Sequence, residues 1–261
     1  MEDIVKSLIL GIVQGFTEFL PISSTGHLLL GRKLMGLSEA GLFLDTMLHL
    51  GTLLAVVVVF WQDIVYMIRR PFSKLSLLVV AATIPTAIIG LTFEDFFEEI
   101  SKTGVTVGWE FLVTGVILWV ADNMKQKGTK HMDQISFKDA LIVGTLQGAA
   151  ILPAISRSGL TIAGALFRGI NKQAAARFSF LVSLPAILGA VVLQTAKLAG
   201  GQAESIGFIP LLVGTIAAAI SGYVAVKWML KILQTGSLKI FSIYVWILGI
   251  GILIAQFLGK F

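Results

Sequence analysis

The sequence contains an internal repeat whose two copies lie 133 residues apart, as Gly11 and Gly144 do. Each copy carries the pattern G-x-x-Q-G, followed after a short apolar run by S-x-[ST]-G. The matching pairs are Gly11/Gly144, Gln14/Gln147, Gly15/Gly148, Ser23/Ser156, Thr25/Ser158, Gly26/Gly159 and Gly31/Gly164. Because the offset is close to half of the 261 residues, duplication explains the pattern better than chance. We therefore expect the two halves to fold alike.

The composition excludes an ordinary soluble domain. The chain is 56% hydrophobic and 13% charged, with a mean hydropathy of +0.90, whereas soluble domains are about 25% charged. We expect a single all-α membrane domain over residues 1–261, since helices satisfy their own backbone in lipid. The acidic start Met1-Glu2-Asp3 does not resemble a signal peptide. The absence of cysteine excludes disulfides, thiolate metal sites and a cysteine nucleophile.

Each half begins with two apolar segments separated by a proline and serines. The segments are roughly Ile4–Leu20 and Gly26–Leu34 in the first half, and Phe137–Leu152 and Gly159–Phe167 in the second. At about 1.5 Å per residue they reach only ~13–25 Å, less than the ~30 Å hydrocarbon core. They are therefore predicted to form re-entrant hairpins whose tips stop inside the membrane.

Three longer apolar segments follow in each half, and we expect each of them to span the membrane. Because three is an odd number, the second half should be inverted relative to the first. The predicted fold is an all-α polytopic membrane protein with two inverted-topology repeats, about 1–125 and 137–261, joined by a linker at about 126–136. Each repeat is a re-entrant helical hairpin plus three transmembrane helices. The predicted spans are about Leu42–Trp61, Leu75–Thr92, Val107–Ala121, Ala174–Leu198, Phe208–Lys227 and Ile240–Phe257.

The basic residues orient the chain. The net charge of +5 could indicate a nucleic-acid partner, but the basic residues lie in short loops, so we expect none. Cytoplasmic loops carry the excess of Lys and Arg, so the first hairpin should enter from outside, the second from inside, and their tips could meet near the midplane. The cytoplasmic set is Arg69, Arg70, Lys74, Lys125, Lys127, Lys130, Lys138, Arg168, Lys172, Arg177, Lys227, Lys231 and Lys239. The outer set is Lys6, Arg32, Lys33, Lys102, Lys197 and Lys260, with Arg157 at a hairpin tip.

The first hairpin places polar groups at membrane depth. Glu18 lies in an apolar run, where a carboxylate costs roughly 2.5–3.5 kcal/mol on insertion scales, and Gln14 lies on the same helical face. The alternative is a glutamate that packs against a neighbour or reaches the interface. After Pro21 the hydroxyls of Ser23, Ser24 and Thr25 can cap a new helix, whose free N–H groups favour phosphate. His27 follows within two turns; alone it would more often be structural, but these neighbours favour function.

The second tip carries Arg157 between Ser156 and Ser158, with Thr161 one turn later. A guanidinium suits bidentate phosphate binding and stays charged. In the alternative, Arg157 only neutralises Glu18 as a buried pair, and the two interpretations are compatible.

Other polar segments are predicted to be structural. We expect His49 and Asp45 to serve helix packing, the acidic stretch 94–99 to form a solvated outer loop, and 125–138 to form the cytoplasmic linker.

Two motifs closely resemble those of the integral-membrane undecaprenyl-diphosphate phosphatases, the bacitracin-resistance family. Residues 14–27 read QGFTEFLPISSTGH, and residues 153–161 read PAISRSGLT. The family's first motif, [E/Q]-x-x-x-E, is met by Gln14 and Glu18. Its second, P-G-x-S-R-S-x-x-T, has Ala154 where glycine is usual, so the backbone of that turn is expected to differ. The resemblance covers the full length of the chain.

The resemblance implies hydrolysis of undecaprenyl diphosphate to the monophosphate plus phosphate. This reaction recycles the lipid carrier for cell-wall polymers. It would take place on the outer face of the bacterial inner membrane and would use a divalent metal. The resemblance also implies a role in bacitracin tolerance and a possible homodimer. Mg²⁺ or Ca²⁺ would be bound by Glu18 and Gln14, because hard cations prefer oxygen ligands. Arg157 would stabilise phosphate charge, His27 would be acid/base or nucleophile, and Ser24 would be nucleophile or phosphate ligand. Water attack and a covalent intermediate both stay open. The expected substrate-binding residues are Ser23, Thr25, Ser156, Ser158 and Thr161.

A transporter or flippase of an anionic lipid is the alternative function, because inverted repeats with broken helices are a transporter architecture. The two hairpins differ, however: Glu18 and His27 have Ile151 and Leu160 at their repeat positions, and Arg157 corresponds to Ser24. An acid–base pair confined to one hairpin favours an enzyme. A non-catalytic scaffold would need none of these costly residues.

Overall fold

The computed structural model describes residues 1–37, 42–124, 128–199 and 206–259, and its regular elements are helices. A single isolated bridge joins Lys130 to Ile170. The helices are α1 (Glu2–Phe19), α2 (Ser24–Leu34), α3 (Leu42–Val59), α4 (Trp61–Arg69), α5 (Lys74–Thr92), α6 (Glu94–Thr103), α7 (Val107–Asp122), the 3₁₀ turn Met132–Gln134, α8 (Phe137–Ala149), α9 (Arg157–Phe167), α10 (Lys172–Ala199), α11 (Phe208–Thr235) and α12 (Lys239–Phe257). The predicted all-α fold is confirmed.

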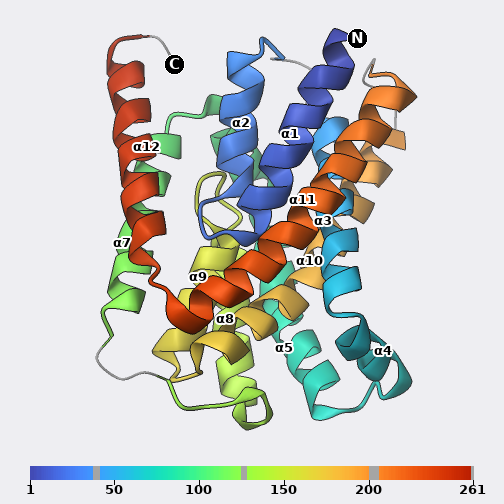
Figure 1. The fold of residues 1–261 in the computed structure, drawn as a ribbon, viewed down its shortest axis with the longest axis vertical. Coiled ribbons are helices and arrows are strands. Elements are labelled where there is room, and N and C mark those ends of the chain that lie inside the picture. Colours follow the sequence, from blue (N-terminus) through green and yellow to red (C-terminus); the bar gives the residue numbers. More distant parts are fainter. Residues whose placement is uncertain (38–41, 125–127, 200–205, 260–261) are drawn as a thin grey trace.

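Two short hairpins, α1–α2 and α8–α9, approach each other from opposite ends of the molecule (Figure 1). Helix α1 ends directly before Leu20-Pro21, since proline cannot continue the hydrogen-bond ladder. The next helix starts at Ser24, where the hydroxyl of Ser23 accepts from the backbone N–H of Gly26 (3.4 Å). Ser156 caps α9 in the same way through Gly159 N–H (3.1 Å). Both predicted breaks are therefore present, with each second helix starting two residues earlier than expected.

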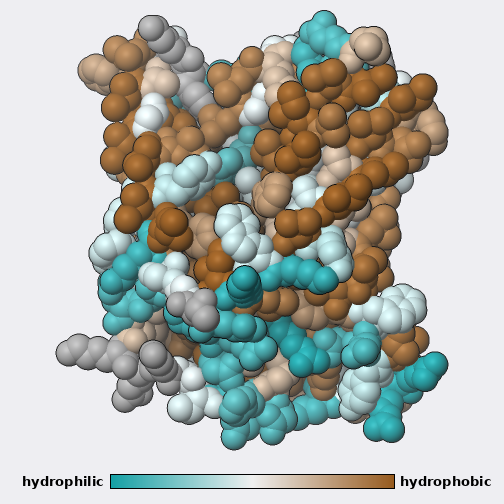
Figure 2. All heavy atoms as spheres, in the orientation of Figure 1, coloured by the Kyte–Doolittle hydropathy of each residue, from teal (hydrophilic) through white to brown (hydrophobic). Residues whose placement is uncertain are grey.

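The long helices run alongside these hairpins. Four helices of the described chain, α5, α10, α11 and α12, are long and apolar enough to cross a membrane, and the bent pair α3–α4 would make a fifth. The predicted span Leu42–Trp61 ends at Val59, where the chain turns by 81° into α4. Helix α7 matches the predicted span but has only 16 residues. On the face that Figure 2 shows, apolar side chains cover most of the upper part, and hydrophilic ones gather at the lower end.

Equivalent helices of the two halves make equivalent contacts. Helix α1 packs against α11, and its repeat mate α8 packs against α5. Gly11 of α1 and Gly144 of α8 allow the close approach, because a Cβ on either would overlap a backbone carbonyl, of Gly214 and Ala82 respectively. Helices α3 and α10 pack on each other, as do α7 and α12. The repeat read from the sequence thus has a counterpart in helix packing.

Two segments differ from the sequence-based expectation. The acidic stretch predicted to be an outer loop is helix α6, in which the apolar residues Phe96, Phe97 and Ile100 recur at the spacing of one helical face. The linker also carries structure: the backbone N–H of Lys130 donates to Gly169 O (3.0 Å), and its carbonyl accepts from Asn171 (2.9 Å). Residues 125–127 of the predicted linker lie outside the described part. The linker is therefore fastened to the base of the second hairpin.

Candidate active site

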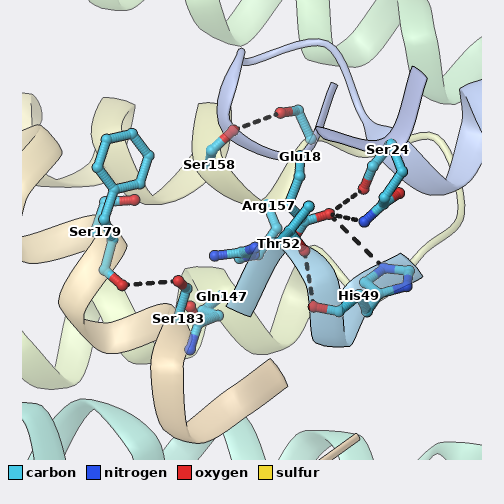
Figure 3. A network of polar contacts seen from close by, with 12 residues as sticks. Glu18, Ser24, His49, Thr52, Gln147, Arg157, Ser158, Ser179 and Ser183 are labelled. Carbon is cyan, nitrogen blue, oxygen red and sulfur yellow. Dashed lines mark hydrogen bonds and ion pairs between the residues drawn. The ribbon is translucent and has the colours of Figure 1, made fainter. Parts of the chain in front are cut away.

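Glu18 lies near the C-terminal end of α1 and is 6% exposed. Its Oε2 accepts from Gln14 Nε2 (3.0 Å) and from Ser24 Oγ (2.5 Å), and Oε1 pairs with the guanidinium of Arg157 (Figure 3). The predicted pair of Gln14 and Glu18 is therefore adjacent, as the helical spacing indicated. Ser24 comes from the second helix of the same hairpin, and Arg157 comes from the opposite hairpin. The buried carboxylate of Glu18 therefore links the tips of the two hairpins.

Arg157 is the first residue of α9, directly after the capping Ser156. One of its terminal nitrogens pairs with Glu18, whereas Nη1 is buried and has no hydrogen-bond partner within the described residues. A buried guanidinium nitrogen without an acceptor is costly. The site thus holds a donor that an anion could satisfy, in addition to the one Glu18 uses.

The two tips are also fastened to each other by serine hydroxyls. Ser23 Oγ donates to Pro153 O (2.8 Å), and Ser158 Oγ donates to Leu20 O (3.2 Å). Ser23 has φ 69°, which makes it the single non-glycine residue of the described chain with a positive φ. Such a conformation costs about 1–3 kcal/mol and is found where the surroundings enforce it, often at functional sites. The crossed bonds provide that enforcement here.

His27 belongs to a separate part of the site. Its Nδ1 lies 2.6 Å from Ser23 O, which can only accept, so Nδ1 carries the proton and Nε2 accepts from the Tyr244 hydroxyl at 2.8 Å when the ring is neutral. The two rings are stacked at 5.7 Å and 11°. Within the described chain, no hydrogen bond or ion pair joins His27 to Glu18. The expected acid–base neighbours are therefore not brought into direct contact in this arrangement.

Three of the remaining predicted phosphate ligands, Ser156, Ser158 and Thr161, use their hydroxyls within the protein. Thr161 Oγ1 donates to Arg157 O (2.8 Å) and lies 2.6 Å from Ser179 Oγ. Ser156 and Ser158 make the capping and tip-joining bonds described above. Thr25 is exposed. The hydroxyls of Ser156, Ser158 and Thr161 could reach phosphate only by exchanging these partners.

His49 and Tyr244 are site residues that the sequence prediction missed. His49 Nε2 lies 3.7 Å from Glu18 Oε2, and its Nδ1 donates to Asp45 O at 2.7 Å. The packing role predicted for His49 did not include this approach to Glu18. No local motif marks either residue, because they come from α3 and α12. The signal that could have found them is the presence of a polar ring in an apolar helix.

The second hairpin retains the glutamine of the repeat but not the glutamate. Gln147 is buried, and its Nε2 donates to Thr86 Oγ1 (3.2 Å) and Val182 O (3.3 Å). Ile151 takes the place of Glu18 one turn later. At the two tips, the carboxylate thus comes from the first hairpin and the guanidinium from the second.

The sequence profile of one family, described as bacitracin resistance protein BacA, matches residues 7–251. The chain belongs to this family. The family resemblance predicted from the two motifs is therefore confirmed, and the BacA-family chain is a multi-pass membrane protein.

Named relatives match almost the whole length of the BacA-family chain. Undecaprenyl-diphosphatase 3 of Bacillus cereus is 59% identical over 257 residues, covering 98% of this chain and 99% of the relative. Undecaprenyl-diphosphatase of Carboxydothermus hydrogenoformans is 53% identical over 263 residues, covering 98% of each chain. The protein of that name from Halothermothrix orenii is 42% identical over 254 residues, covering 97% and 98%.

Ala154, which replaces the usual glycine of the second BacA-family motif, is accommodated without a positive φ. Its side chain is buried opposite Gly26, where an added Cβ would come within 3.2 Å of the Ala154 Cβ. The missing Cβ of Gly26 thus leaves room for the methyl group of Ala154.

Proposed function

We propose that this chain hydrolyses undecaprenyl diphosphate to undecaprenyl phosphate and inorganic phosphate at the meeting point of the two hairpin tips. The observation that carries the assignment of the site is the buried Glu18 carboxylate, which binds Ser24 of its own hairpin and Arg157 of the other. The full-length similarity to proteins named undecaprenyl-diphosphatase carries the substrate and the reaction. The product would return to the pool of lipid carrier for peptidoglycan and other cell-wall polymers.

Arg157 is the phosphate-binding residue in this proposal. Its Nη1 donates to no acceptor within the described residues and is available to a phosphate oxygen, and Nη2 can exchange the Glu18 carboxylate for a second phosphate oxygen. Bidentate guanidinium–phosphate contacts are strong and directional. As the bond to the terminal phosphoryl group breaks, charge grows on its oxygens, and a fixed guanidinium stabilises that charge. The buried pair with Glu18 therefore keeps the arginine in place until substrate arrives.

Glu18 and Ser24 form the acid–base part of the site. Because Ser24 Oγ already donates to Glu18 Oε2 at 2.5 Å, the carboxylate can take the hydroxyl proton as the oxygen attacks the terminal phosphorus. The bond from that phosphorus to the oxygen of the undecaprenyl monophosphate breaks, and water releases phosphate in a second step. In the alternative route, Glu18 takes a proton from water that attacks directly. His27, whose Nε2 accepts from the Tyr244 hydroxyl, would act as a base that takes up a proton during the reaction.

The oxygen atoms present fit a divalent cation that arrives with the diphosphate. Gln14 Oε1 is buried without a hydrogen-bond partner, and the Glu18 carboxylate lies beside the same side chain. No group of three or more His, Asp, Glu or Cys residues in the described chain could hold a metal alone. Mg²⁺ commonly uses one or two carboxylates together with substrate phosphates. Bound there by Glu18 and Gln14, Mg²⁺ or Ca²⁺ would neutralise charge on the diphosphate.

The helix packing supports an inverted-topology duplication. Ser221 Oγ of α11 donates to Gly11 O (3.3 Å), and Thr86 Oγ1 of α5 donates to Gly144 O (2.8 Å), so the α1–α11 and α8–α5 contacts share one kind of bond. The hairpins enter from opposite ends (Figure 1). With the excess of basic residues placed in the cytoplasm, the base of α1–α2 faces the outer side of the bacterial inner membrane. The active site would then be reached from outside.

The homodimer stays a prediction from the family resemblance.

The test is phosphate release by the purified protein in detergent from a polyprenyl diphosphate with Mg²⁺ or Ca²⁺. We expect release by the wild type and losses of at least about 100-fold in Glu18→Ala and Arg157→Ala, because removing one preorganised charge at a transition state typically costs 10²–10³. His27→Ala should also lose activity, and Thr145→Val, an exposed change outside the site, should not. Equal release by all variants would refute the site. No release by a folded wild type would favour transport of an anionic lipid, the function that the opposed hairpins would otherwise suit.

A further inference from the structure

Glu110 of α7 is a buried carboxylate that the proposed reaction does not use. It is 6% exposed, and no basic side chain of the described chain pairs with it. Its Oε1 accepts from the hydroxyl of Thr106 (2.6 Å), and its Oε2 accepts from the backbone N–H of Ala154 (2.6 Å). A carboxylate inside a membrane protein is costly and is commonly functional. Here it binds the tip of the second hairpin.

Thr114 lies one turn further along α7 and binds the same tip. Its Oγ1 donates to Ala154 O (3.1 Å) and accepts from the backbone N–H of Ser156 (3.2 Å). The chain between α8 and α9 has no helical ladder, because Pro153 interrupts it. Backbone groups at membrane depth must still find partners. Glu110 and Thr114 satisfy three of them, and the last one belongs to the residue directly before Arg157.

Phe111 lies between them in sequence and contacts the first hairpin. Its ring meets the His27 ring edge to face at 5.5 Å and 87°. A Cβ on Gly26 would come within 2.6 Å of the Phe111 ring, so glycine is what allows this approach. One segment of α7 thus contacts both hairpin tips, beside His27 on one and beside the backbone that leads into Arg157 on the other.

We propose that the α7 segment formed by Glu110, Phe111 and Thr114 is a positioning element that sets Arg157 and His27 for phosphoryl transfer. The inference rests on the proposed function. None of the three residues touches phosphate; they act through the backbone of residues 154–156 and through the His27 ring. A reacting group displaced by about 1 Å can lose roughly 100-fold in rate. Their removal should therefore lower kcat more than it changes KM.

Thr114→Val is the first test, because it keeps the shape of the side chain and removes both hydrogen bonds. We expect kcat to fall by about 10–100-fold, with KM within about threefold of wild type. Thr114→Ser keeps the hydroxyl and should stay within about threefold of wild type in kcat. Thr215→Val is the matched control: Thr215 is also buried, but its hydroxyl binds Leu211 of its own helix. It should leave kcat unchanged.

Glu110 supplies a second pair of variants that keeps the test decisive if Thr114→Val does not fold. Glu110→Gln retains an acceptor for Ala154 N–H, whereas Glu110→Met does not. We expect Glu110→Met to lose at least tenfold more kcat than Glu110→Gln. Similar kcat in the two variants would overturn the positioning role. So would wild-type kcat in Thr114→Val.

A double-substitution cycle shows whether the effect passes through Arg157. In an Arg157→Lys background, Thr114→Val should lower kcat by less than about threefold, since coupled residues are not additive. A full 10–100-fold loss in that background would mean that Thr114 acts elsewhere, and would refute the inference. The proposed function would instead be refuted if Arg157→Lys were as active as the wild type, or if the wild type itself released no phosphate. Failure of the positioning role and failure of the proposed function therefore give different results.

Discussion

Replacement of Asp139 by asparagine should loosen the base of the second hairpin. Asp139 is the third residue of α8, and its side chain is fully buried. Its Oδ2 accepts from Lys130 Nζ (3.1 Å), Ser136 N–H (3.0 Å) and Ser136 Oγ (2.8 Å), and its Oδ1 accepts from Arg168 Nε (2.8 Å). The carboxylate thus joins the linker, α8 and the end of α9.

The magnitude follows from the number of donors. Asparagine has one acceptor oxygen, so it can keep the bonds to Ser136 and Lys130 while its amide N–H₂ faces Arg168. One hydrogen bond to a charged group contributes about 1.5–3 kcal/mol. Because the Arg168 and Lys130 side chains are 33% and 36% exposed, water can solvate them, and no fully buried charge is left unpaired. We expect a loss of about 2–3 kcal/mol, which lowers Tm by roughly 4–12 °C.

The pH dependence of this loss is fixed by the direction of the pKa shift. Burial raises the pKa of Asp139, but the bonds from Ser136, Arg168 and Lys130 outweigh it and hold the pKa well below the ordinary 3.8. A carboxyl with a lowered pKa stabilises the folded state above its unfolded pKa, and this contribution disappears as the pH falls through the folded pKa. The difference between the wild type and Asp139→Asn should therefore be constant from pH 8 to about 5 and shrink only below about pH 4.

Thermal unfolding in detergent, followed by tryptophan fluorescence at several pH values, measures both quantities. Asp133→Asn is the control, because Asp133 is exposed in the same segment and contacts Lys74 through its backbone carbonyl. An Asp139→Asn protein with wild-type Tm at pH 7 would refute the reasoning. A difference that already shrinks between pH 7 and 5 would refute the assigned direction of the pKa shift.

Three further predictions test packing, the site and the topology. Gly144→Val should destabilise the protein by about 1–3 kcal/mol through overlap with α5. The control Gly251→Val, which has open space around it, should leave Tm unchanged. Equal changes of Tm in the two variants would contradict the close approach of α8 and α5 at Gly144. His49→Ala should lower kcat/KM about tenfold, the equivalent of ~1.4 kcal/mol for one lost contact to Glu18; an unchanged kcat/KM would remove His49 from the site. Membrane-impermeant thiol labelling of intact cells should modify Val105→Cys and spare Thr129→Cys, and the reverse pattern would invert the orientation.

The sequence predicted the parts of the fold that depend on local signals. Pro21 and Pro153, each followed by serine, marked the two helix breaks because proline ends a hydrogen-bond ladder wherever it occurs. The repeat then indicated that the breaks are equivalent. The sequence placed the end of the α3 span at Trp61, close to Val59, but it gave no sign of the 81° turn into α4, because hydropathy reports burial in lipid and not the direction of the chain.

The candidate site was predictable only where its residues are close in sequence or carry a charge at membrane depth. Gln14, Glu18 and Arg157 satisfy one of these conditions, and the structure brings them together. His49 and Tyr244 satisfy neither, since their partners lie 31 and 217 residues away. Uncharged rings in apolar helices have an ordinary packing role in most sequences, and only tertiary contacts distinguish the exceptions.

The pairing of Glu18 with Arg157 has a consequence for how the protein is made. The two residues are 139 positions apart, and the crossed bonds of Ser23 and Ser158 also join the first hairpin to the second. During synthesis the first hairpin is complete long before its neutralising arginine has left the ribosome. An uncompensated carboxylate at membrane depth is costly, so we expect the first hairpin to reach its final depth only when Arg157 is present. We therefore expect the centre between the tips to form late, by docking of the second hairpin, and a chain truncated before Arg157 should leave the first hairpin exposed to membrane proteases.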